Sequence, residues 1–327
     1  SLLGKWAEFQ NQCRQRPDTV AALDNFTERP GTCTIYRCPS PIRHVVTPAV
    51  FAIVLLAAFL HALWNAMIKG SLDRTLALGL IALGHVVPGV ALAMVVPAPL
   101  VAAWPYIVAS TVIHWGYYYY LNAAYRVGDL SFVYPVARGL APVMIALGAL
   151  VLADEYLPVL AWVGIAIVSL GILSLALSLV LWRHLPKHSP AFVPAVLTAI
   201  LIAAYSIIDG LGIRQSGSPL GYIAWLFSAE ICVAVFVLYP RAATLRTNGM
   251  RVLWIGLIGG LVSGLAYALV LYAKTLAPLG IIAAVRETSV IIAALIGVLV
   301  FGERPAKTRI LSAIIVALGV AVIAYTQ

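Results

Sequence analysis

The chain has 327 residues, of which 62% are hydrophobic and only 10% are charged, and its mean hydropathy is +0.99. A water-soluble protein of this length cannot hide so much apolar surface, so the composition excludes a soluble fold and indicates an integral membrane protein. The formal net charge of +9 does not indicate nucleic-acid binding, because the basic residues are scattered through short connections, as topology signals are.

Residues 1–45 differ from the rest of the chain. They hold ten charged residues and no long apolar run, and they lack the pattern of a signal peptide. One interpretation is a disordered cytoplasmic tail. The other, which we favour, is a segment outside the natural coding sequence, with the protein starting at Val45 or Val46 from a non-ATG codon. Sequencing the N-terminus of the native protein distinguishes the two.

The four cysteines give no indication of a metal site. Paired cysteines at zinc-ligand spacing, followed by a second pair, are absent from the sequence. We therefore expect no disulfide, no metal and no cofactor. The cysteines are Cys13, Cys33, Cys38 and Cys232.

From residue 46 onward, ten apolar segments are long enough to cross a membrane. Runs this long and continuous satisfy their backbone in lipid only as helices. The sequence therefore predicts an all-α integral membrane protein with ten transmembrane helices. The predicted segments are Val46–Ile68, Thr75–Val96, Ala103–Ala123, Phe132–Leu152, Pro158–Leu181, Pro190–Ile208, Pro219–Leu238, Val252–Ala273, Gly280–Val300 and Thr308–Tyr325.

The second half of the chain repeats the first. A shift of 148 positions places Arg138 on Arg286 and Gly171 on Gly319, and a shift of 141 places the first segment on the sixth. Because five is odd, the second half must enter the membrane from the opposite side, which gives an inverted repeat, the usual plan of secondary transporters. We expect two five-helix repeats, at residues 46–181 and 190–327, joined by a linker at 182–189.

Both repeats contain an arginine inside an apolar segment. Such a charge costs roughly 2.5–3.5 kcal/mol at a helix centre, and it usually faces the bundle interior or a wet cavity, with a partner. For Arg138 the alternatives are a substrate contact or a structural lock with an acid, and for Arg286 we favour a pair with Glu287 or Glu230.

An acid follows each arginine by 17 positions, as Glu155 and Glu303. These two acids precede helices and are expected to cap them.

Three stretches carry a resemblance to a known family: "HALWNAMIK" (61–69), "AYRVGDLSFVYPVARGLAP" (124–142) and "FGERP" (301–305). Together with ten segments and two repeats, the chain resembles the EamA family of the drug/metabolite transporter superfamily, over about residues 47–327. The resemblance implies a ten-helix inverted-repeat fold, a central cavity, and export or exchange of small metabolites such as amino acids, purines or drug-like compounds. The chain departs from the family pattern where Arg286-Glu287 replaces the Arg138-Gly139 step.

Polar and aromatic residues inside the segments are the candidates for a substrate cavity. His61 and Asn65 lie one turn apart on the same helix face, and tyrosine rings can stack on a cyclic substrate. The alternative for each is hydrogen bonding between packed helices. Tyr117–Tyr120 cannot all face one way, so some of them must meet lipid. The candidates are His61, Trp64, Asn65, His114, Tyr117, Arg138, Tyr205, Tyr267 and Arg286.

Glu230 and Glu287 are candidates for proton coupling, because a carboxyl embedded in the membrane can carry a proton. The alternative for Glu230 is a salt bridge to Arg286 or a hydrogen-bonded, protonated carboxyl. We interpret His85 as a packed, hydrogen-bonded group, and Lys69 as a topology anchor at the membrane edge.

The basic residues after residue 45 predict an orientation. The odd-numbered connections hold 11 of these 15 residues and the even-numbered ones hold two, Arg214 and Lys274. The positive-inside rule then places the odd connections in the cytoplasm and both termini outside.

The sequence thus predicts a transporter of the inner (cytoplasmic) membrane, not an enzyme, driven by a proton gradient or by exchange. We expect a small-molecule substrate, lipid contacts, no nucleic acid, and a monomer or homodimer. The runner-up is a flippase for lipid carriers or glycolipids. The sequence has no P-loop, which a nucleotide-driven pump would need. It has no cluster of catalytic residues such as a lipid-modifying enzyme would need, and its membrane-embedded charges argue against a permanent channel.

Overall fold

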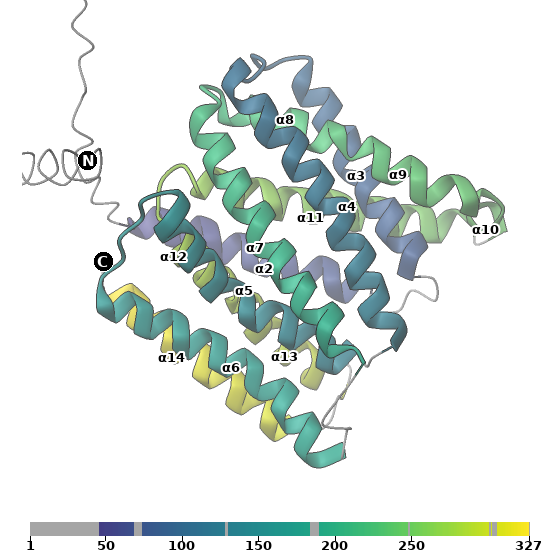
Figure 1. The fold of residues 1–327 in the computed structure, drawn as a ribbon. Helices are drawn as coiled ribbons and strands as arrows, with labels where there is room; N and C mark the ends of the chain where they lie inside the picture. Colours follow the sequence, from purple (N-terminus) through teal and green to yellow (C-terminus); the bar gives the residue numbers. More distant parts are fainter. Residues whose placement is uncertain are drawn as a thin grey trace, which may run out of the picture. The chain divides into compact units, whose positions relative to one another are not determined.

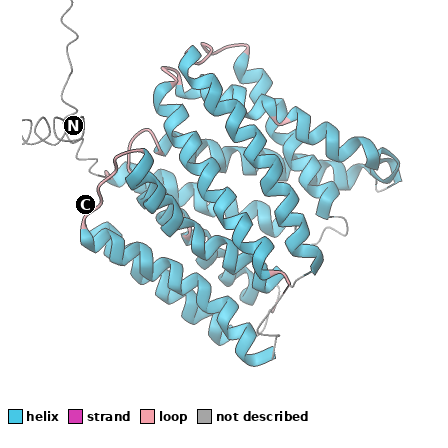
Figure 2. Cartoon of the chain, in the orientation of Figure 1, coloured by secondary structure: helices cyan, strands magenta, loops and turns pink. Residues whose placement is uncertain are grey.

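The computed structural model describes residues 46–68, 74–127, 130–183, 190–247, 249–300, 302 and 306–326. The expected tail at 1–45 and Glu303 lie outside these residues. The described part is helical and has no strand (Figure 2). Its α-helices are α2 (Pro48–Ile68), α3 (Arg74–Ala93), α4 (Trp104–Val127), α5 (Leu130–Leu152), α6 (Val159–Arg183), α7 (Phe192–Gln215), α8 (Pro219–Ala229), α9 (Ile231–Leu238), α10 (Ala242–Thr247), α11 (Gly249–Ala273), α12 (Leu279–Arg286), α13 (Thr288–Leu299) and α14 (Ala306–Tyr325).

Nine helical segments in the described residues are long and apolar enough to cross a membrane. Each of them overlaps one of the ten predicted segments; seven agree within about four residues at both ends, and two, Phe192–Gln215 and Pro219–Leu245, extend further than predicted. The predicted segment at 103–123 forms α4, a helix of 24 residues that is not among the nine, because tyrosines and a histidine lower its hydropathy.

The prediction that the sixth segment ends at Ile208 was wrong. Helix α7 continues to Gln215 and is followed by Ser216, whose hydroxyl donates to the Ile213 carbonyl at 2.7 Å. The extension adds two turns of helix, with an acid and an arginine in them, to the part of the chain that packs against its neighbours.

Two of the predicted spans are interrupted helices. One span is split into α8 and α9 at Glu230 (φ −66°, ψ −8°), and another is split into α12 and α13 at Glu287 (φ −68°, ψ −6°). At each break the backbone amide bonds back three residues, Glu230 N to the Phe227 carbonyl at 3.2 Å and Glu287 N to the Ala284 carbonyl at 3.1 Å. The interruptions therefore fall on the two carboxylates predicted as proton-coupling candidates.

Local sequence sets the other helix ends. Helix α8 begins after Ser218, whose hydroxyl accepts from Gly221 N at 3.1 Å, with Pro219 in the first turn, as expected for a helix start. Helix α5 ends where Asp154 takes a left-handed conformation with φ 52°, which an α-helix cannot continue through.

The packing partners of the helices form a repeating pattern. Helices α6 and α14 lie side by side (Figure 1), α4 packs on α7, and α11 packs on α2. In the α6–α14 contact the helices meet at glycines: a Cβ at Gly164 would lie 2.9 Å from the Gly319 carbonyl oxygen, and the converse distance is also 2.9 Å. Small residues allow such close approach between helices in a membrane.

Helices α3 and α11 also cross at a pair of glycines. A Cβ added at Gly84 would lie 2.6 Å from the Cα of Gly260, so neither helix can move aside without losing the contact. We expect Gly84→Ala to destabilise the protein by about 1–3 kcal/mol, the usual cost of overpacking, measured as thermal unfolding in detergent. Gly116→Ala is the control, because its Cβ would meet Leu201 at an ordinary 3.5 Å. If Gly84→Ala and Gly116→Ala lower the unfolding temperature equally, this explanation of the α3–α11 crossing is contradicted.

Candidate functional site

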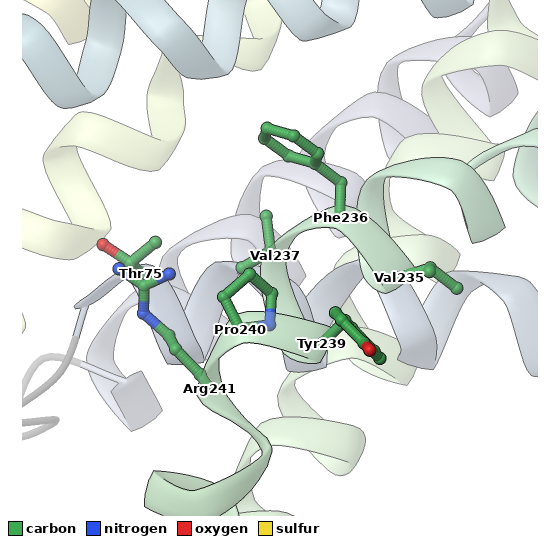
Figure 3. Close-up of a pocket in the computed structure, with 7 residues that line it drawn as sticks. All are labelled: Thr75, Val235, Phe236, Val237, Tyr239, Pro240 and Arg241. Atoms are coloured by element: carbon green, nitrogen blue, oxygen red, sulfur yellow. The ribbon is translucent and has the colours of Figure 1, made fainter.

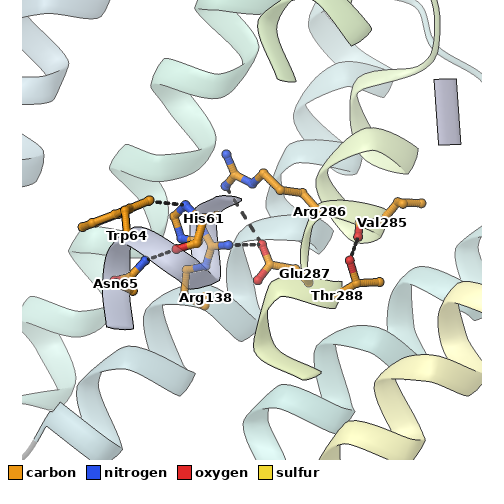
Figure 4. Close-up of polar contacts among 8 residues, drawn as sticks. All are labelled: His61, Trp64, Asn65, Arg138, Val285, Arg286, Glu287 and Thr288. Atoms are coloured by element: carbon orange, nitrogen blue, oxygen red, sulfur yellow. Dashed lines mark hydrogen bonds and ion pairs between the residues drawn. The ribbon is translucent and has the colours of Figure 1, made fainter. Parts of the chain in front are cut away.

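Three charged residues from α5 and the α12–α13 break form a buried group, here called the central charged cluster: Arg138, Arg286 and Glu287 (Figure 4). Arg138 Nη2 lies 2.9 Å from Glu287 Oε1, and Arg286 Nη2 lies 4.0 Å from the same oxygen. The exposed fractions are 6% for each arginine and 1% for Glu287. One carboxylate thus faces two cations, which leaves a net positive charge in the bundle interior.

Several polar atoms of this cluster lack a hydrogen-bond partner within the described residues. They are Nε of both arginines and Oε2 of Glu287, and the hydroxyl of buried Ser289 is in the same condition. Most buried polar groups in proteins are hydrogen-bonded, so a group with spare donors and acceptors is suited to binding a polar molecule.

The polar stripe of α2 lies beside the cluster, although its side chains bond mainly to one another. Trp64 Nε1 donates to His61 Nδ1 at 3.3 Å, and Asn65 Nδ2 donates to the His61 carbonyl at 2.7 Å (Figure 4). The amide group of Asn65 thus has one hydrogen bond within its own helix, to the carbonyl one turn earlier, and its role as a cavity residue stays a prediction.

Four of the predicted aromatic candidates come together from α4, α7 and α11, and we call them the aromatic cluster: His114, Tyr117, Tyr205 and Tyr267. The His114 ring stacks on Tyr205 with centroids 4.2 Å apart, and Tyr205 lies 5.8 Å from Tyr117 and 6.3 Å from Tyr267. Tyr119, by contrast, is exposed, as expected if it meets lipid. Tyr205 lies close enough to Arg286 to interact with its charge, so the aromatic cluster adjoins the central charged cluster.

Glu230 pairs with His85 rather than with Arg286. Its Oε2 lies 2.9 Å from His85 Nδ1, and both residues are buried. The alternative of a salt bridge to Arg286 is thus wrong, because the α8–α9 break turns Glu230 toward α3. His85 also stacks on Phe227 at 5.1 Å, and Phe227 stacks on Tyr267 at 6.3 Å, which joins this pair to the aromatic cluster.

Sequence reasoning missed a second buried polar group, the Asp209 cluster: Asp209, Tyr222, Tyr267 and Lys274. Tyr222 donates to Asp209 Oδ1 at 3.1 Å, and Tyr267 donates to Oδ2. Asp209 is fully buried and Lys274 is 3% exposed. The signal was available, since an aspartate followed an apolar run, but the predicted segment ended one residue before it.

Glu155 caps the N-terminus of a helix, but the helix is α12 and not the one that follows Glu155 in the chain. Its Oε2 accepts from Leu279 N, the first residue of α12, at 2.7 Å, and its Oε1 lies 2.7 Å from Arg214 Nη1. The expectation that it caps the helix directly after it was wrong, because tertiary packing brings α12 closer. A carboxylate at a helix N-terminus is favourable in either case.

The surface pockets lie elsewhere. One, of about 520 Å³, is lined by Thr75, Val235, Phe236, Val237, Tyr239, Pro240 and Arg241 (Figure 3). Another, of about 200 Å³, lies between α13 and α14. The central charged cluster lines neither of these two.

The second half of the chain is similar to a known protein family. The model of the EamA-like transporter family matches residues 190–325. The comparison with curated proteins finds no match. A solved structure titled "Crystal structure of protein" aligns with a TM-score of 0.65 at 16% identity and covers 85% of this chain and 96% of that chain. Identity this low shows a shared fold alone.

Proposed function

We propose that this chain, whose residues 190–325 match the model of the EamA-like transporter family of the drug/metabolite transporter superfamily, is a secondary transporter that exports small organic metabolites across the inner membrane by alternating access. Family members are membrane transporters rather than enzymes. The observation that carries the proposal is the central charged cluster, with its spare donors and acceptors at a break in a membrane helix.

The proposal includes ten spans arranged as two inverted repeats. Helix α4, at 24 residues, is about 36 Å long and reaches across a hydrocarbon core of roughly 30 Å. The helix packing also favours a two-fold relation between the two halves of the chain. Under it α2 corresponds to α7 and α4 to α11, so the α4–α7 contact corresponds to the α11–α2 contact.

Substrate recognition in this proposal uses both clusters. The guanidinium groups of Arg138 and Arg286 attract an anionic or strongly polar group, and Glu287 limits the positive charge they present. The rings of Tyr205 and His114 offer a face on which a flat substrate can stack.

Proton coupling is assigned here to the Glu230–His85 pair, with Glu287 as the second candidate. Both carboxylates lie where a helix is interrupted, and discontinuous helices are the usual sites of substrate and ion binding in secondary transporters. A carboxyl and an imidazole at 2.9 Å can share one proton, and its loss would change the contact between α3 and α8.

The test is a thermal-shift screen of a metabolite library on the purified protein in detergent. A ligand at 100 times its Kd raises apparent stability by about 2.7 kcal/mol. We expect shifts from one chemical class, and loss of those shifts in Arg138→Lys, which keeps the charge but not the planar, two-pronged geometry. His85→Gln is the matched control, because it removes the coupling pair and leaves the binding groups in place.

Shifts that persist in Arg138→Lys would show that Arg138 is structural. Shifts from phosphoprenyl lipids alone would overturn the metabolite proposal in favour of a flippase.

A further inference from the structure

Lys274 is the first residue after α11, and it is buried where a charged side chain is costly. Its exposed fraction is 3%. Its ammonium group has three donors, but within the described residues its one hydrogen bond goes to the Ser206 carbonyl at 3.0 Å. The Tyr267 ring, with its centroid 5.7 Å from Nζ, adds a weak cation–π contact. The protonated form of Lys274 therefore has fewer hydrogen-bond acceptors around it than its ammonium group can use.

Asp209 is the nearest compensating charge, and its two oxygens are already engaged. Each oxygen accepts from a tyrosine hydroxyl, Tyr222 on α8 and Tyr267 on α11. No salt bridge joins Asp209 to Lys274 in the described part of the chain. The carboxylate therefore acts on the ammonium at a distance, and Tyr267 lies between them.

Other charges around Lys274 act against its protonation. Arg214 on α7 donates from Nε to the Lys274 carbonyl at 2.7 Å, and Arg286 lies on α12. Burial has the largest effect on the pKa of Lys274 and lowers it, Asp209 raises it, and Arg286 and Arg214 act with burial; together they lower the pKa to about 7. Other titratable groups near the site include Tyr222 and Tyr267, which donate to Asp209, Tyr205, which interacts with the charge of Asp209, and, through Arg214, Glu155.

We propose that the Asp209 cluster is a proton-binding site, separate from the central charged cluster and from the Glu230–His85 pair, in which Lys274 is the group that gains and loses the proton. The reaction is an exchange between the ammonium and the neutral amine, with the proton passing to or from water. The connection that carries Lys274 reaches the protein surface nearby, since Leu276, two residues on, is 39% exposed.

Proton binding here also connects to the contact between the two halves. The segment that follows α11 supplies the carbonyls of Lys274 and Ala277 to Arg214, at 2.7 and 2.9 Å. Arg214 in turn pairs with Glu155. A change of charge on Lys274 therefore acts on the residues that hold the loop after α5 against the start of α12.

The chain offers a direct measurement, because it contains only five lysines: Lys5, Lys69, Lys187, Lys274 and Lys307. The full-length protein, labelled with ¹³C at the lysine ε carbon, is titrated by NMR in detergent, and Lys274→Met identifies the signal. We expect a midpoint between about pH 6 and 8, against roughly 10.4 for an ordinary lysine. A midpoint above about pH 9.5 overturns the proposal.

Two variants and a control separate a proton site from a merely structural lysine. Asp209→Asn removes the compensating charge, so the Lys274 midpoint should fall by about one pH unit or more; an unchanged midpoint would show that the two residues do not form one site. In the wild type, unfolding takes up protons between pH 7 and 9, because the unfolded lysine stays charged there, so stability should rise with pH. Lys274→Met should flatten that rise, whereas Lys307→Met, at an exposed position, should keep it.

The inference deepens the proposed transport function, because it names a second place where a coupling proton can bind. The titration requires no transport and no substrate. If Lys274 does not titrate as expected, the proton-site proposal fails and the transporter proposal is unaffected. If Lys274 titrates as expected but the protein transports no metabolite, only the transporter proposal fails.

Discussion

Glu287→Ala is expected to destabilise the folded protein by about 3–5 kcal/mol, the usual cost of removing one partner from a buried ion pair. Glu287 is 1% exposed and is the acid beside two arginines, at 2.9 and 4.0 Å. Its removal leaves both guanidinium groups buried without a compensating charge. The measurement is thermal unfolding in detergent at neutral pH.

Two further variants test the cause of this loss. Glu287→Gln keeps the shape and one acceptor, so it should fall between the wild type and the alanine variant. Combining Arg138→Met with Glu287→Ala removes two charges together, and should recover part of the loss, since contacting residues are not additive. If the free energy of unfolding of Glu287→Ala lies within about 1 kcal/mol of the wild-type value, water solvates the two arginines, and the explanation from a buried ion pair is contradicted.

Asp209→Ala should cost about 2–4 kcal/mol, because it strips the hydrogen-bond partner from two tyrosines and the compensating charge from Lys274. Asp209 and Tyr222 are both fully buried, so water cannot easily replace the lost acceptor. Thermal unfolding at pH 7 and pH 9 measures the effect. The loss should be larger at pH 7, where Lys274 is protonated to a greater extent.

Tyr222→Phe is the matched control for that experiment. It removes one hydrogen bond to Asp209 and leaves the carboxylate, so about 1 kcal/mol is expected, with little dependence on pH. An Asp209→Ala variant no less stable than Tyr222→Phe would mean that the carboxylate compensates no charge.

The positions of the helices were largely readable from the sequence. A helix crossing lipid needs about 20 apolar residues, and polar connections mark its ends, so α2, α5 and α11 begin and end within about three residues of their predicted limits. The buried arginines were readable for the same reason, since a charge inside such a run is conspicuous. The breaks at Glu230 and Glu287 were not, because neither position carries a glycine or proline to announce them.

The partners of the charged residues could not be read from the chain. His85 and Glu230 are 145 positions apart, and Glu155 and Leu279 are 124 apart. Such pairs depend on which helices pack together, and apolar helices reveal little of that in their sequence. Lys274 illustrates the problem, since a lysine directly after a span resembles a topology signal whether its side chain points to water or into the protein.

The glycine contact between α6 and α14 bears on how the molecule can move. At Gly164 and Gly319 the two backbones approach closely, and a Cβ at either position would also meet a side chain of the partner helix, Ile323 or Val168. Backbone and side chains therefore interlock along this contact, and sliding one helix past the other would require them to separate. We accordingly expect the last helices of the two sequence halves to move together as one rigid pair in any conformational change.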